Sequence, residues 1–117
     1  MAEERDERRR EPRVNVAIGA RVRFGRRDAE QSAVTVDLSP EGARLRSVRP
    51  VAHGQGVMLE LQLDPFSAAI ECKARVTWAA RVSNGLCSFG VRFLDLRYEE
   101  AEILQDFVSA VGGAAAV

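Results

Sequence analysis

The sequence predicts a mainly β protein, a six-stranded antiparallel barrel followed by one C-terminal amphipathic helix. Hydrophobic residues alternate with polar or small ones in six short segments, which is the period of half-buried strands. Turn-forming residues separate these segments, and after residue 97 the hydrophobic period becomes helical. A chain of 117 residues accommodates one domain with a single modest core.

The predicted strands follow one another at short intervals. The first covers residues 14–24, and the second, 34–38, ends at the turn Ser39-Pro40-Glu41-Gly42. The third begins at Ala43, and the last three cover residues 57–63, 70–78 and 89–93. Asn84-Gly85 is a strong hairpin signal between the last two. Short strands ahead of one helix indicate an antiparallel barrel whose open end or edge the helix covers.

The two ends of the chain differ from its middle. Residues 1–13 carry almost only charged side chains, so this segment is expected to be flexible. The helix is expected to end at Gly112-Gly113. The predicted organisation is therefore a charged N-terminal segment (1–13), the barrel with its helix (14–111) and a frayed tail (112–117).

Composition excludes several classes of function. The net charge is zero, so no global field attracts nucleic acid or an anionic membrane, and no apolar run is long enough to span a bilayer. Cys72 and Cys87 have no close-spaced partners and are expected to be reduced, buried thiols in a cytoplasmic protein. The single histidine, His53, has no partner at a triad or metal spacing, so neither an enzyme nor a metal site is predicted.

Two motifs mark the candidate site. Arg9 and Arg13 form an RxxxR just before the first strand, and Asp37-Leu38-Ser39-Pro40-Glu41-Gly42 forms a DxSxxG that closes the second. Arginine is so frequent here that RxxxR alone means little, whereas DxSxxG is expected in roughly one random chain in forty of this composition. Their order and context make the pair informative.

With these motifs the chain resembles the PilZ domain, the bacterial receptor module for the second messenger cyclic di-GMP, from about Arg8 to Val111. The strand around Val76-Thr77-Trp78 and the segment 89–96 also fit. The resemblance implies a PilZ-like barrel and a cyclic di-GMP site made of Arg8, Arg9, Arg13, Asp37, Ser39 and Gly42. It also implies a receptor without cofactor that changes its contacts with an unidentified downstream protein. A basic residue at Arg8 goes, in this family, with an intercalated pair of nucleotides.

The residue types suit this ligand. Arginine can fork onto phosphate oxygens or onto guanine O6 and N7, and it can stack on the purine. The Asp37 carboxylate can accept the N1–H and N2–H donors of guanine, and Ser39 can donate to a phosphate or to the Hoogsteen edge. Gly42 supplies either a positive φ or room for close approach of the ligand to the backbone. A simple turn capped by Asp37 or Ser39 is the alternative, and both apply if the turn directs Asp37 outward.

Other functions stay open. A PilZ-like module can act through constitutive protein interaction without a nucleotide. A barrel that binds single-stranded nucleic acid needs exposed aromatics on a basic groove, and most aromatics here, Trp78 included, are in phase with the core. The arginines at positions 44, 46 and 49 could extend a basic surface, although exposed strand faces often have this composition. The expected state is a monomer or weak homodimer without nucleic acid or membrane insertion.

Overall fold

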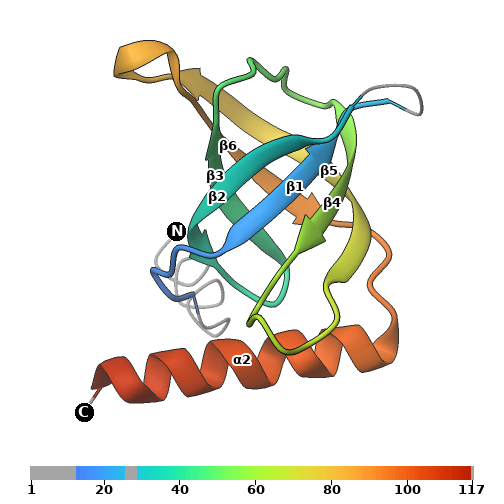
Figure 1. The fold of residues 1–117 in the computed structure, drawn as a ribbon, viewed down its shortest axis with the longest axis vertical. Helices are drawn as coiled ribbons and strands as arrows, with labels where there is room; N and C mark the ends of the chain where they lie inside the picture. Colours follow the sequence, from blue (N-terminus) through green and yellow to red (C-terminus); the bar gives the residue numbers. More distant parts are fainter. Residues whose placement is uncertain (1–12, 26–28, 117) are drawn as a thin grey trace, which may run out of the picture.

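Six strands close into an antiparallel barrel, and one helix lies across its lower end (Figure 1). The structure, a computed structural model, describes residues 13–25 and 29–116, with backbone alone for 114–116. The elements are β1 (Gly19–Arg23), β2 (Gln31–Leu38), β3 (Gly42–Ser47), β4 (Gly56–Leu61), β5 (Ile70–Arg81), the 3-10 turn η1 (Ser83–Gly85), β6 (Cys87–Phe93) and α2 (Tyr98–Ala116). The predicted fold class, a six-stranded antiparallel barrel with a C-terminal helix, is confirmed.

The strands neighbour one another in the order β1-β2-β3-β6-β5-β4, and β4 pairs back with β1. Closure leaves no free sheet edge, so α2 covers an end of the barrel instead. The predicted hairpin at Asn84-Gly85 joins β5 to β6, and both residues have a positive φ, 68° and 76°.

The first strand begins later than the alternation predicted, at Gly19 instead of Val14. Val14 forms only an isolated bridge to Leu38. Between these points the side chain of Thr35 takes the place of a ladder partner. Its hydroxyl accepts the Ile18 amide at 2.9 Å and donates to the Val16 carbonyl at 2.5 Å. The segment before β1 is therefore attached to β2 through the Thr35 side chain together with backbone hydrogen bonds, among them the one from the Thr35 amide to the Ile18 carbonyl at 3.0 Å.

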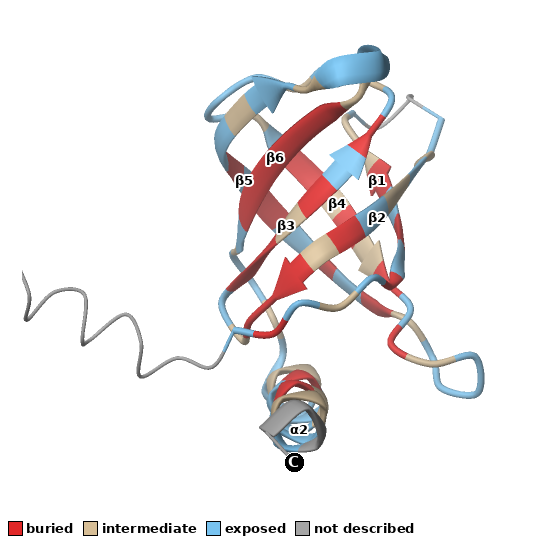
Figure 2. Cartoon of the chain, turned by 90° about the vertical axis from the view of Figure 1, so that its left-hand side faces the viewer, coloured by how far each residue is buried: buried red, intermediate tan, exposed pale blue. Residues whose placement is uncertain are grey.

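The core is built from the inward-facing residues of all six strands together with α2. Burial alternates along the strands, as the red and pale blue bands of Figure 2 show. Leu104 and Val108 of α2 are fully buried, and burying each contributes up to about 1.5–3 kcal/mol. Cys72 and Cys87 are buried and free, as predicted, and burial raises the pKa of Cys72 to about 12.

The prediction that Gly112-Gly113 ends the helix is wrong, because α2 continues to Ala116. Gly112 lies against Val14, whose side chain would be 3.4 Å from a Cβ at that glycine. This packing and the good helix propensity of the alanines that follow outweigh the glycine penalty. Within the described residues, no helix has the length and hydropathy needed to cross a membrane.

Candidate functional site

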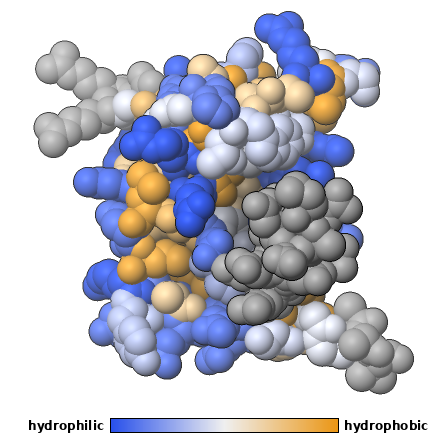
Figure 3. Space-filling model, turned by 180° about the vertical axis from the view of Figure 1, so that it is seen from behind, coloured by the Kyte–Doolittle hydropathy of each residue, from blue (hydrophilic) through white to orange (hydrophobic). Residues whose placement is uncertain are grey.

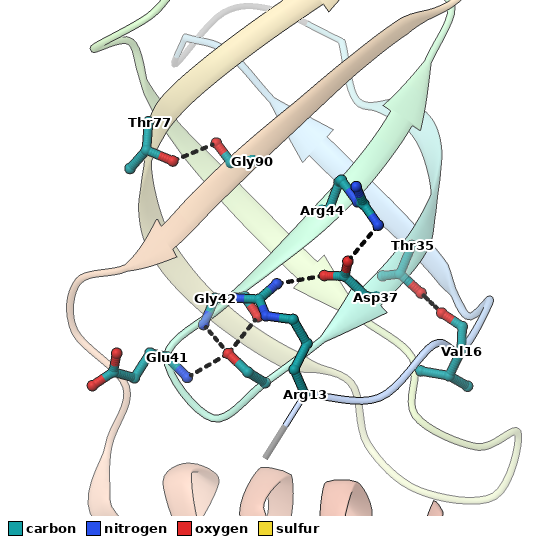
Figure 4. A network of polar contacts seen from close by, with 10 residues as sticks. Arg13, Val16, Thr35, Asp37, Glu41, Gly42, Arg44, Thr77 and Gly90 are labelled. Atoms are coloured by element: carbon teal, nitrogen blue, oxygen red, sulfur yellow. Dashed lines mark hydrogen bonds and ion pairs between the residues drawn. The ribbon is translucent and has the colours of Figure 1, made fainter. Parts of the chain in front are cut away.

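The carboxylate of Asp37, at the end of β2, lies between two arginines (Figure 4). Its Oδ1 is 2.5 Å from Arg13 Nη1, and its Oδ2 is 2.8 Å from Arg44 Nη2. The Asp37 side chain is only 6% exposed, whereas those of Arg13 and Arg44 are 54% and 44% exposed. The two guanidinium groups therefore cover a carboxylate that is itself almost fully buried.

A β-bulge brings Arg44 to this carboxylate. The pairing of β2 with β3 shifts between Thr35 and Asp37, so that Asp37 stands opposite Arg44 and Leu38 opposite Ala43. Without the extra residue, Asp37 would face Ala43 and its side chain would lie on the other side of the sheet. The two charges thus become a cross-strand pair on one face.

The turn after Asp37 is held by Ser39. Its hydroxyl accepts the amides of Glu41 at 3.3 Å and Gly42 at 3.2 Å, and it donates to the Gly42 carbonyl at 3.3 Å. Ser39 is buried, and none of the turn's hydrogen bonds uses the Asp37 carboxylate. Of the two predicted caps, Ser39 is therefore the one that caps the turn, and the Asp37 carboxylate is available for ion pairs with the arginines.

Of the two predicted reasons for a glycine at position 42, the positive φ is wrong, and the structure shows a further reason. The φ of Gly42 is not positive, and a Cβ at this position would lie 2.2 Å from the carbonyl oxygen of Val91 in β6. The close approach that needs a glycine is thus made by the backbone of the neighbouring strand.

Trp78 was predicted to be in the core, and this is wrong, because it is 40% exposed. A second bulge, between Val76 and Trp78, shifts β5 against β6 and pairs Trp78 with Gly90. A Cβ at Gly90 would be 2.2 Å from Trp78 Nε1, so the indole lies directly against the glycine backbone. An aromatic surface is thereby exposed beside the charged cluster.

These groups line one groove of about 430 Å³. Its lining consists of Arg13, Asp37, Ala43, Arg44, Thr77, Trp78, Gly90 and Val91. Two guanidinium groups, one carboxylate and an indole offer donors, acceptors and a stacking surface, with a net positive charge. The buried Nε of Arg44 has no hydrogen-bond partner among the described residues, so one donor is left unsatisfied.

The structure describes four of the six predicted site residues, Arg13, Asp37, Ser39 and Gly42. Arg8 and Arg9 lie outside the described residues. Arg13 and Asp37 are in direct contact, and Ser39 and Gly42 form the turn next to them. Sequence reasoning missed Arg44 and Trp78 as members of the groove, because each depends on a bulge that the alternation does not reveal. In the described part of the chain, no cluster of three or more His, Cys, Asp or Glu side chains can hold a metal.

Comparison with solved structures supports the same fold. The Bacillus subtilis inhibitor of motility, MotI/DgrA, superposes with a TM-score of 0.78 at 11% identity, covering 89% of this chain and 51% of that one. Escherichia coli YcgR in complex with c-di-GMP gives a TM-score of 0.76 at 15% identity, covering 93% of this chain and 48% of that one. The PilZ domain of Escherichia coli YcgR with c-di-GMP gives a TM-score of 0.73 at 16% identity, covering 92% of this chain and 94% of that one. The chain thus spans about half of the first two proteins and nearly all of the isolated domain.

Comparison with protein families is more specific. The comparison with curated proteins gives no match. The model of the PilZ domain matches residues 7–110, which include both motifs and all six strands. The chain therefore belongs to the PilZ domain family.

Proposed function

We propose that this chain is a receptor for cyclic di-GMP and that the groove around Asp37 is its binding site. The observation that carries the proposal is the buried Asp37 carboxylate held between Arg13 and Arg44 beside the exposed indole of Trp78. Two of the similar structures are described as complexes with c-di-GMP, which favours the same ligand class here.

Recognition of guanine requires an exchange at Asp37. The base brings N1–H and N2–H donors to a carboxylate whose oxygens both contact arginines in the free protein. Arg13 is the arginine to be displaced, because it is the more exposed of the two and precedes the strands. The guanine donors replace the hydrogen bond that the buried carboxylate loses, so Asp37 stays paired throughout the exchange. The freed guanidinium can then bind a phosphate of the ligand.

The other groups of the groove complete the site. The exposed indole of Trp78 can stack on a guanine, and base–aromatic stacking contributes about 1–3 kcal/mol. The Nε–H of Arg44 has no hydrogen-bond partner in the part of the chain that the structure describes, and a phosphate or guanine oxygen can accept from it. Ser39 and Gly42 hold the turn that sets the position of Asp37, in addition to any direct contact they make.

Arg8 and Arg9 extend the site from the N-terminal side in this proposal. An intercalated pair of nucleotides brings four phosphodiesters together, and further guanidinium groups offset their repulsion. The N-terminal segment then becomes ordered around the ligand and alters the surface seen by a downstream protein. Calorimetric stoichiometry of the parent and of Arg8→Leu tests this step: we expect two nucleotides per chain and one, respectively. One nucleotide in both proteins would remove Arg8 from the site.

The primary test is titration with cyclic di-GMP and with cyclic di-AMP. Adenine lacks the N1–H and N2–H donors and would leave Asp37 without its partners, so the site should reject it by at least about tenfold. Equal affinity for the two dinucleotides would contradict the proposed role of Asp37.

A second candidate is a PilZ module that acts by protein contact alone. The observation in its favour is that Asp37 and Ser39 already have hydrogen-bond partners within the chain. Under this function the parent would show no heat of binding with either dinucleotide, whereas mutation of the groove would still change its stability.

A further inference from the structure

The most exposed large hydrophobic side chain in the described part of the molecule is Phe66, at 96%. It belongs to the loop between β4 and β5, residues 62–69, here called the Phe66 loop. This loop protrudes from the lower end of the barrel, at the lower right of Figure 2. Single exposed hydrophobic residues are common, so exposure alone carries little weight. The hydrogen bonds that hold this loop in place are more informative.

The Phe66 loop is fixed by its own polar groups. Asp64 Oδ1 accepts the Phe66 amide at 2.8 Å, and Asp64 Oδ2 accepts the Ser67 hydroxyl at 2.7 Å. The amide of Gln62 donates to the carbonyls of Asp64 at 2.6 Å and Ser67 at 2.7 Å. An aromatic ring is thus held in solvent on an ordered, anionic support. Such preorganisation reduces the entropy lost when the ring enters a partner.

The outer face of the β4–β5 hairpin has two halves of opposite charge. Near the Phe66 loop, Glu60 stands directly opposite Glu71, and Arg21 of β1 lies 4.0 Å from the Glu60 carboxylate on its other side. Further from the loop, the outward-facing residues are Lys73 and Arg75. Neither Glu71 nor Lys73 forms an ion pair with any described residue.

An apolar groove of about 330 Å³ lies against the positive half. Met58, Val57 and Leu94 contribute hydrophobic surface to it, and Lys73 and Arg75 are part of its lining. Figure 3 shows hydrophobic side chains gathered between hydrophilic ones on the back of the barrel. A groove with an apolar floor and a cationic rim suits an aromatic ring carried on an anionic loop. This chain itself presents such a ring in the Phe66 loop.

We infer that two copies of the chain associate through their β4–β5 hairpins about a twofold axis, with Phe66 of each copy in the groove of the other. The ring and most of the groove lining belong to one hairpin, and Ile70 to Arg75 spans about 17 Å, so both contacts can form at once. An axis at the level of Cys72 sets Glu71 of one copy against Lys73 of its partner, and the reverse. The interface is self-complementary, as a closed dimer requires.

Sedimentation velocity over a concentration series, without nucleotide, tests the hydrophobic contact. The parent should show a monomer–dimer equilibrium that weakens with added salt, because its ion pairs are exposed. Phe66→Ser should weaken association by about 30-fold. Val48→Ser, which removes another exposed hydrophobic side chain away from this hairpin, should leave it unchanged.

Charge reversal tests the symmetry. Glu71→Lys or Lys73→Glu alone should each prevent pairing, because the twofold axis repeats every repulsive contact. An equimolar mixture of the two variants should associate again, since each then supplies what the other lacks. Arg81→Glu reverses an exposed charge beyond the hairpin on the same strand and should have no effect. Circular dichroism verifies that every variant is folded.

Three results would overturn the inference. One is a parent that sediments as a monomer at every concentration. Another is a dimer that Phe66→Ser and the charge reversals leave intact. The third is a pair of folded, monomeric charge-reversal variants whose mixture stays monomeric. None of these results depends on whether the chain binds a nucleotide.

Discussion

Two turns of this molecule start from an aspartate and contain a proline and a serine, yet they use these residues differently. In the turn after β2, Ser39 caps the backbone, and the Asp37 carboxylate contacts Arg13 and Arg44. In the Phe66 loop, the Asp64 carboxylate itself caps the turn, since it accepts the backbone amide of Phe66 and the side-chain hydroxyl of Ser67. Similar composition therefore gives one carboxylate that faces cations and one that is occupied by its own turn.

The difference lies in the register and not in the residue types. Asp37 precedes its turn within a strand, where a bulge places it opposite Arg44. Asp64 lies within its loop, two residues before the amide that it accepts. A turn aspartate is available to a ligand only when another residue caps the turn, and this explains why Asp37 is the candidate and Asp64 is not.

The largest effect we predict comes from removing each carboxylate in turn. Asp37→Ala should weaken cyclic di-GMP binding by about 100-fold, because charge-assisted hydrogen bonds to guanine are lost. It should also lower the free energy of unfolding by about 1 kcal/mol, since its arginine partners are half-exposed. Asp64→Ala should leave the affinity unchanged. Calorimetry measures the affinity, and urea denaturation measures the free energy of unfolding. Equal affinities for the two variants would contradict the proposal that only the Asp37 turn binds the nucleotide.

The second prediction concerns the glycine of the first turn. Gly42→Ala should lower the free energy of unfolding by about 1–3 kcal/mol, because a Cβ would collide with the Val91 carbonyl at 2.2 Å. Gly19→Ala is the matched control in β1, where a Cβ meets no atom of the described residues within 4 Å. Chemical denaturation of the free protein should separate the two variants. A stable Gly42→Ala protein that fails only in ligand binding would instead assign the glycine to the nucleotide.

The third comparison uses two exposed aromatic residues, Trp78 in the groove with Asp37 and Phe66 in the loop with Asp64. Trp78→Ala should weaken nucleotide binding by about tenfold through loss of stacking. Phe66→Ala should not change it, because the Phe66 loop lines no part of the groove. Both side chains are exposed, so neither change should lower the melting temperature strongly. A loss of affinity in Phe66→Ala would place the ligand elsewhere.

Much of the architecture could be predicted because it depends on local chemistry. Alternation with a period of two specifies strands whatever their partners, and Asn84-Gly85 fixes a hairpin through two positive φ angles. The spacing of DxSxxG correctly located the turn, because Ser39 reaches the amides of Glu41 and Gly42 only at that spacing.

What could not be predicted depends on distant contacts. A bulge moves every following side chain to the other face, so neither the role of Arg44 nor the exposure of Trp78 can be read from alternation. The continuation of α2 past Gly112 similarly depends on Val14, almost a hundred positions earlier in the chain. The residues that complete the groove are thus those that the local pattern describes least well.

The smallest predicted effect tests whether Asp64 is occupied by its own turn. Hydrogen bonds from the Ser67 hydroxyl and the Phe66 amide lower the pKa of the Asp64 carboxyl below its ordinary value of 3.8. Because the folded loop favours the carboxylate, its hydrogen bonds are complete above that value and are lost as the pH falls through the lowered pKa. An NMR titration that follows the Phe66 amide should therefore show its midpoint below 3.8. Ser67→Ala should move the midpoint back up, whereas Ser83→Ala, in the opposite hairpin, should not. If the chemical shift of the Phe66 amide does not change during the titration, Asp64 does not hold the loop. The proposed difference between the two turns is then wrong for the Phe66 loop.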